Sequence, residues 1–179
     1  MTVLSDEVIM SKVRDGNLAE LSELFERYHV RMYNFFLSLT NDKSTSQDLV
    51  QDLFSRIIKY RSSYKGKGTF KSWIYRMARN IHIDYCNQNK KAHDQIKDVK
   101  NDQENMMEST EIYNDEDYYK LERALQQLSP EQQQIIVLSR FQGLKYQEIS
   151  KIQNASVAAI KVQVHRALKQ LRVIYFNLA

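Results

Sequence analysis

The residues of this chain best suited to chemistry are cations interleaved with aromatic rings. Between positions 56 and 91 the sequence holds ten basic side chains and one acidic side chain, Asp84. The rings among them are Tyr60, Tyr64, Phe70, Trp73, Tyr75 and Tyr85. Cations neutralise phosphates, and exposed rings stack on unpaired bases for about 1–3 kcal/mol per base. The segment is therefore typical of a surface that binds single-stranded nucleic acid. Rings at helical spacing also build hydrophobic cores. We favour a core position for Phe70, and for Trp73 a core position and a nucleic-acid contact are equally supported.

A second basic segment follows a predicted helix-turn-helix near the C-terminus. No acidic residue occurs from position 150 to position 179. The outward face of the last predicted helix carries Lys161, Gln163, His165, Arg166 and Lys169. An apolar stripe and a tight turn fit a corner between two helices of a bundle as well as they fit a helix-turn-helix. A helix face that carries cations and no carboxylates favours contact with duplex DNA.

Composition excludes several other classes of function. The four histidines, His29, His82, His93 and His165, are scattered, and Cys86 is the single cysteine. No metal-protease, phosphate-loop or nucleophile-elbow motif occurs, so we expect no enzyme, no catalytic residue, no metal site, no cofactor and no small-molecule substrate. No stretch approaches 18 apolar residues, no leader pattern precedes the first helix, and a single cysteine fits a reducing compartment, so we expect a cytoplasmic protein without direct membrane insertion.

The elements that must position these residues are helices. Four glycines and one proline in 179 residues cannot supply the turns of a β fold, so the predicted class is all-α. Apolar spacing and capping signals predict four helices in the first half: a short helix over 5–13 before Gly16, a long helix over 18–39, a helix from a Ser44/Gln47 capping box to Ile58, and a helix capped by Thr69 that runs to Tyr85. In the second half they predict a helix that ends near Leu128 and a helix that begins after Ser129 and ends at Gly143. A pair of helices separated by Asn154 follows, with Ser156 as the N-cap of the second.

An acidic stretch divides these helices into two basic lobes. Residues 92–117 carry nine acidic and two basic side chains and few apolar ones, in a chain whose overall net charge is +4. We predict a helical bundle over 1–91, a flexible acidic linker over 92–117, and a helix-turn-helix domain over 118–179. A solvated helix anchored by Met106, Met107 and Ile112 is the alternative for the linker.

Three segments in this order resemble the extracytoplasmic-function branch of the bacterial sigma-70 family. DLVQDLFSRIIKY, from Asp48, resembles the helix that binds core RNA polymerase. SYKGKGTFKSWIYRMARNIHIDYCNQNKK, from Ser63, resembles the segment that melts promoters and reads the minus-ten element. LSPEQQQIIVLSRFQGLKYQEISKIQNASVAAIKVQVHRALKQLR, from Leu128, resembles the domain that reads the minus-thirty-five element.

The resemblance implies a site for each partner. Contacts to core polymerase would come from Asp48, Gln51, Asp52 and Phe54. Contacts to the minus-ten element as single-stranded DNA would come from Tyr64, Lys65, Lys67, Phe70, Trp73, Arg76, Arg79, Asn80, His82 and Lys90, the loop residues with Asn80 shaping a pocket for a flipped base. Contacts to the minus-thirty-five element as duplex DNA would come from Ser156, Lys161, Val162, His165, Arg166 and Lys169.

The expected function is therefore an alternative sigma factor, with core RNA polymerase and promoter DNA as partners. Family members are commonly held by an anti-sigma factor, often membrane-anchored, so we expect such a partner here. Val162 and Gln163 stand where many members have serine and arginine, which changes the bases read. The alternative from another class is a free-standing helix-turn-helix regulator with a helical sensor domain, which leaves the basic aromatic loop unexplained.

Overall fold

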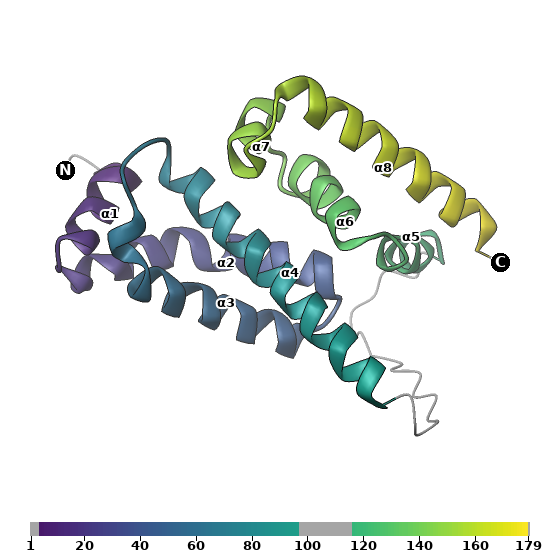
Figure 1. Cartoon of the computed structure of the whole chain (residues 1–179), viewed down its shortest axis with the longest axis horizontal. Coiled ribbons are helices and arrows are strands. Elements are labelled where there is room, and N and C mark those ends of the chain that lie inside the picture. Colours follow the sequence, from purple (N-terminus) through teal and green to yellow (C-terminus); the bar gives the residue numbers. More distant parts are fainter. Residues whose placement is uncertain (1–3, 97–115, 179) are drawn as a thin grey trace.

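The structure is a computed structural model that describes residues 4–96 and 116–178. Within these ranges the chain forms helices joined by short turns, and no strand occurs (Figure 1). The predicted all-α class is confirmed. None of the helices described here combines the length and the apolar character that a membrane span requires.

The first half is a bundle built around one long helix. Its elements are α1 (Asp6–Arg14), a 3-10 turn (Leu18–Glu20), α2 (Leu21–Thr40), α3 (Lys43–Lys59), a second 3-10 turn (Arg61–Ser63) and α4 (Phe70–Ile96). Phe35 and Phe36 of α2 are fully buried, and the Phe35 ring lies 5.7 Å from the Tyr75 ring of α4. Burying a side chain of this size contributes about 1.5–3 kcal/mol, so the apolar stripes seen in the sequence hold the bundle together.

Capping fixes where these helices begin, and one capping expectation was wrong. Thr69 caps α4 as predicted, because the Ser72 amide donates to the Thr69 hydroxyl at 3.2 Å. Ser5 is the N-cap of α1, and its hydroxyl accepts from the Val8 amide. The Ser44/Gln47 capping box does not form. Asp42 is the N-cap of α3 instead and accepts from the Thr45 amide. A carboxylate two residues earlier starts the helix sooner, and Asn41 makes the turn before it in the left-handed region at φ 50°.

The second half carries the predicted helix-turn-helix. Its elements are α5 (Glu116–Gln126), α6 (Pro130–Ile136), a π-helical turn (Val137–Phe141), α7 (Tyr146–Gln153) and α8 (Val157–Asn177). Ser129 opens α6 as predicted and forms a capping box with Gln132. Asn154 separates α7 from α8 as predicted, in the left-handed conformation with φ 53°. The Ser156 hydroxyl accepts from the Ala159 amide at 3.1 Å, which starts α8. The helix boundaries predicted from the sequence at Ser129, Asn154 and Ser156 are confirmed.

The junction between the halves is shorter than the acidic stretch in the sequence. Helix α4 continues to Ile96 and α5 begins at Glu116, so both helices enter the predicted linker at 92–117. The prediction of flexibility falls on residues 97–115, which lie outside the described residues.

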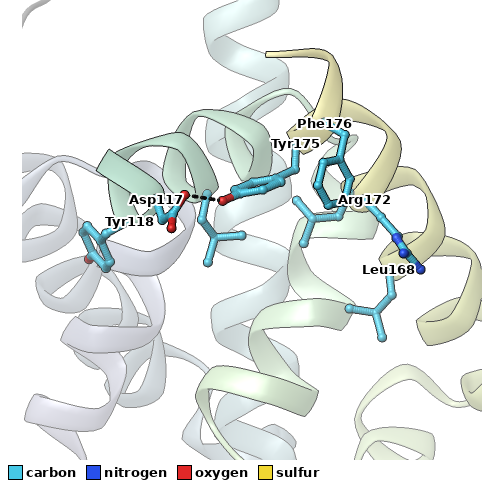
Figure 2. Close-up of a pocket in the computed structure, with 8 residues that line it drawn as sticks. Asp117, Tyr118, Leu168, Arg172, Tyr175 and Phe176 are labelled. Carbon is cyan, nitrogen blue, oxygen red and sulfur yellow. Dashed lines mark hydrogen bonds between the residues drawn. The ribbon is translucent and has the colours of Figure 1, made fainter. Parts of the chain in front are cut away.

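The two halves pack directly on each other. Helix α4 lies against α6 and α7, α2 lies against the π-helical turn, and the buried residues of both halves form one continuous hydrophobic cluster (Figure 1). Helix α8 packs on α5, α6 and α7 along the outer side of the second half (Figure 1). Where α8 meets α5, the Tyr175 hydroxyl donates to the Asp117 carboxylate at 2.8 Å (Figure 2). The sequence predicted two lobes separated by a tether, and the structure adds a contact between them.

Candidate polymerase and nucleic-acid surfaces

The residues expected to bind core polymerase divide between the surface and the core of α3. Asp48 and Gln51 are exposed, and Asp52 is half-buried in an ion pair with Arg56 at 3.0 Å. Phe54 is 7% exposed and its ring meets the Phe25 ring edge-on at 4.8 Å. The first three therefore offer polar groups to a partner, whereas Phe54 supports the helix from beneath.

The basic loop before α4 presents its lysines and buries its tyrosine. Lys65 and Lys67 are exposed beside Gly66 and Gly68, which have φ +67° and +100° and let the backbone turn sharply. Tyr64 is 3% exposed, and its hydroxyl has no hydrogen-bond partner among the described residues. Burial raises the pKa of the Tyr64 hydroxyl above its ordinary value. The phenol is therefore neutral at physiological pH and retains an unused donor.

Aromatic contacts set the position of Tyr64 against α4. Its ring meets the Trp73 ring edge-on at 5.4 Å and lies 6.3 Å from the Phe70 ring. Phe70 is fully buried, as its favoured reading predicted, while Trp73 is only partly buried. In this conformation Tyr64 and Phe70 are core residues, and Trp73 joins the core to the surface.

A hollow between α3 and α4 lies next to this aromatic group. It has a volume of about 470 Å³, and it is lined by Arg56, Tyr60, Ser63, Trp73, Arg76, Met77, Asn80, Ile83 and Asp84. Arginines, an amide and rings at one depression suit a phosphate and an unpaired base together. Three residues predicted to contact single-stranded DNA, Trp73, Arg76 and Asn80, thus line one hollow. Arg56 and Tyr60 also line this hollow, and they were not among the DNA contacts that the family resemblance implied.

Three other predicted DNA contacts of α4 face the second half or lie along the exposed end. Arg79 is half-buried, and its Nε has no hydrogen-bond partner among the described residues. His82 is 1% exposed, with Nδ1 2.9 Å from the Gln134 Nε2 of α6. Burial lowers the pKa of His82 to about 4, although Glu131 opposes the shift, so the imidazole is neutral at pH 7. Lys90 is exposed beyond this contact. His82 is thus a packing residue in this conformation.

Helix α8 brings its predicted contacts to one face. Ile160, Val164 and Ala167 are buried against the rest of the domain. The exposed residues with the complementary spacing are Lys161, Val162, His165, Arg166 and Lys169. Positions three and four apart share a helix face, so the cations and the imidazole project together from α8, and the major groove of B-DNA admits an α-helix. The Ser156 hydroxyl accepts the capping hydrogen bond of α8, and the residue is exposed at the start of this face.

Within the described ranges no group of three or more histidine, cysteine and carboxylate side chains is placed to hold a metal ion. The hollow beside α4 presents arginines, an amide and rings, and the face of α8 presents cations and an imidazole. Such groups bind a polyanion without an added ion.

Comparison with known proteins covers both halves of the chain. The model for sigma-70 region 2 matches residues 24–92, and the model for sigma-70 region 4 matches residues 118–171, together about two thirds of the chain. Among curated proteins, the ECF RNA polymerase sigma factor SigX of Bacillus subtilis is 27% identical over 157 residues, which are 83% of this chain and 80% of SigX. RNA polymerase sigma factor CarQ of Myxococcus xanthus is 27% identical over 91% of this chain and 93% of its own length.

Solved structures agree with the fold. CnrH, solved in complex with the cytosolic domain of CnrY, superimposes with a TM-score of 0.70 at 18% identity over 97% of this chain and 99% of CnrH. The sigma factor RpoE of Bartonella quintana, solved with the anti-sigma factor NepR, superimposes with a TM-score of 0.64 at 22% identity over 89% of this chain and 99% of RpoE. Because regions 2 and 4 match in order and relatives of similar length are ECF sigma factors, the chain belongs to the sigma-70 family, in its extracytoplasmic-function group.

Proposed function

We propose that this protein is an alternative sigma factor, which binds core RNA polymerase and directs it to particular promoters. The observation that carries the proposal is the exposed face of α8, where cations and an imidazole from Lys161 to Lys169 lie on a helix-turn-helix without a nearby carboxylate on that helix. That face suits duplex DNA, while the hollow between α3 and α4 suits an unpaired strand. A protein that reads a duplex and also holds a separated strand has the two contacts that promoter opening needs.

We assign the contacts to regions of the chain as follows. Residues 1–91 would form the unit for polymerase binding, minus-ten recognition and melting, residues 92–117 the linker, and residues 118–179 the unit for the minus-thirty-five element. Asp48 and Gln51 offer acceptors to a basic polymerase surface, with Asp52 shared with Arg56. No step of chemistry is assigned to the chain, whose role is to place the polymerase, and the expected location is the bacterial cytoplasm.

The single-strand contacts are proposed from α4 and its loop. Lys65, Lys67 and Lys90 would track phosphates from exposed positions. Asn80, Trp73 and Arg76 would hold a base or phosphate in the hollow that they line. Tyr64 and Phe70 would shape this site from below, and Tyr64 has an unused hydroxyl for hydrogen bonding if the loop shifts.

An anti-sigma factor is the further partner that we propose. Two solved proteins of this fold are complexes, CnrH with the cytosolic domain of CnrY and RpoE with the anti-sigma factor NepR. A partner that separates the halves or covers α8 would block the surfaces described above.

A binding experiment separates this proposal from a free-standing regulator. We would measure retention of the chain by immobilised core polymerase for the wild type, for Asp48→Lys with Gln51→Ala, and for Lys43→Ala as an exposed control on the same helix. The proposal predicts retention of wild type and control and a loss of about tenfold or more for the double variant, because charge reversal opposes the basic partner. Equal retention of all three proteins would show that Asp48 and Gln51 do not bind core polymerase. If core polymerase did not retain the wild type, the result would favour the free-standing helix-turn-helix regulator.

A further inference from the structure

The first helix of the bundle, α1, supplies a cap to the start of α4. One carboxylate oxygen of Glu7 accepts a hydrogen bond from the Phe70 amide, with 3.0 Å between Oε1 and the nitrogen. Phe70 is the first residue of α4, so its amide is one of the donors that a helix leaves without an intrahelical partner. An anion at this end also interacts favourably with the helix dipole. Glu7 therefore holds the first turn of α4 from a position 63 residues earlier in the chain.

Helix α1 is itself fixed to α2 by the neighbouring carboxylate. Asp6 accepts a hydrogen bond from the Tyr28 hydroxyl at 2.5 Å and forms an ion pair with Arg27 at 2.6 Å. The Tyr28 ring meets the Phe70 ring edge-on, with 5.2 Å between the centroids. Phe70 is therefore held twice, by Glu7 at its amide and by Tyr28 at its ring.

The basic loop before α4, residues 64–69, depends on its two ends for its shape. It contains Gly66 and Gly68, and glycine has more conformational freedom than any other residue. Helix α1 lies against the second 3-10 turn, which leads into the loop, and against α4, which follows it. Burial and then the Glu7 charge raise the pKa of the Tyr64 hydroxyl, so the carboxylate is close to the first residue of the loop. Helix α1 thus borders the loop at its entry and at its exit.

The first turn of α4 carries the ring that lines the hollow beside α3. The Trp73 amide donates to the Thr69 carbonyl at 3.2 Å, and the Trp73 ring meets the Tyr64 ring at 5.4 Å. Trp73 shares a helix face with Arg76 and Asn80, which line the same hollow. A loosened first turn would therefore move the ring relative to the other two side chains.

We propose that Glu7 is a positioning residue for the single-strand site, because it fixes the first turn of α4 and with it the position of Trp73 in the hollow. Glu7 acts through the Phe70 amide and makes no contact with nucleic acid itself. Without this hydrogen bond the loop and the first turn must be ordered when a strand binds, and that ordering costs affinity. The inference rests on the proposed function for the ligand of the hollow, whereas the effect on Trp73 does not depend on that ligand.

Three variants with the same change of net charge test this role. Glu7→Ala removes the acceptor of the Phe70 amide, and Glu7→Gln removes the charge but keeps an oxygen that can accept the hydrogen bond. Glu26→Ala, at an exposed position of α2, is the matched control. Far-UV circular dichroism and urea unfolding check that each variant is folded under the conditions of the binding measurements.

The readouts are one spectroscopic signal and two affinities, measured on the full chain without polymerase. Trp73 is the single tryptophan in the sequence, so acrylamide quenching of tryptophan fluorescence reports its accessibility directly. Fluorescence anisotropy reports the affinity for a labelled single-stranded DNA of mixed sequence and for the duplex of the same sequence.

The expected results separate positioning from a general loss of stability. Compared with Glu26→Ala, Glu7→Ala should increase the quenching of Trp73 and weaken single-strand binding by about fivefold, the order expected for one lost capping hydrogen bond. Its duplex affinity should be unchanged, because the proposed duplex contacts lie on α8. Glu7→Gln should match Glu26→Ala in all three readouts.

Several results overturn the inference. Equal quenching in Glu7→Ala and Glu26→Ala means that Glu7 does not hold Trp73. Increased quenching with unchanged single-strand affinity means that this position does not matter for binding. Equal losses for single strand and duplex, or the same loss in Glu7→Gln, mean that the effect does not come from this hydrogen bond. If Trp73 responds as expected but the wild type binds no single strand, the control of Trp73 by Glu7 stands and the proposed single-strand contact fails.

Discussion

The buried histidine of α4 predicts how stability depends on pH. His82 is 1% exposed and hydrogen-bonded to Gln134 of the second half, and burial lowers its pKa to about 4. In the unfolded chain the imidazole has an ordinary pKa of about 6.5. Between these values the unfolded state binds a proton that the folded state does not. The free energy of unfolding therefore falls as pH falls from about 6.5 to about 4.

The size of this effect follows from the shift. A difference of about 2.5 pKa units at about 1.36 kcal/mol per unit gives a loss of about 3 kcal/mol across the window, for one group. Asp42 and Glu148 also have pKa values lowered in the folded protein. The Thr45 amide lowers the pKa of Asp42, and for Glu148 desolvation raises the pKa but is outweighed by Lys71 and the Lys145 amide. Their stabilisation is lost nearer their ordinary acidic values, so the range from pH 6.5 to 5 isolates His82.

Urea unfolding followed by far-UV circular dichroism measures the effect. We would compare wild type with His82→Gln at pH 7.5, 6.5, 5.75 and 5. The wild type should lose about 2 kcal/mol between pH 6.5 and 5. The variant keeps a hydrogen-bonding side chain beside Gln134 and should stay nearly flat over the same range. A flat wild-type profile, or an equal slope in both proteins, would refute the assignment of the slope to buried His82.

Three further predictions concern packing and caps. Asp42→Ala should lower the free energy of unfolding by about 1 kcal/mol through loss of the α3 cap, whereas Ser44→Ala should change it little; equal losses in urea unfolding would contradict the assignment of the cap. Phe35→Ala should cost about 3–5 kcal/mol, since the ring is fully buried, and a thermal midpoint close to wild type would argue against this core. At Asn154, with φ 53°, glycine should be tolerated and valine should destabilise, which unequal thermal midpoints would reveal.

Local structure was largely predictable from this sequence. Apolar spacing gave the helices, and Ser129, Asn154 and Ser156 gave their ends, because each signal acts within one or two turns of the chain. The cap at Asp42 was missed because Asp42 and Ser44 are both good caps two residues apart. Sequence alone does not say which of two adjacent caps the preceding turn will place correctly.

Contact between the halves was not predictable in the same way. Tyr75 and Gln142 lie 67 residues apart in the chain. A hydrogen bond between two such side chains produces no periodic pattern in the sequence from which it could be predicted. Burial of Tyr64 and His82 was missed for a related reason: cations interleaved with rings identify a basic segment but not which ring turns inward. The face of α8 was predictable because its polar residues stand opposite a regular apolar stripe.

Run-off transcription with core polymerase tests the central claim most directly. The reaction would contain core polymerase, a pool of genomic fragments and the wild-type chain, Arg166→Ala or no chain, and the transcript starts would be sequenced. The account predicts starts that require the chain and share upstream sequence. Initiation should fall by about tenfold for Arg166→Ala, which lies within the loss of about 1–3 kcal/mol expected for one contact to a base edge. Starts that are the same with and without the chain would contradict it.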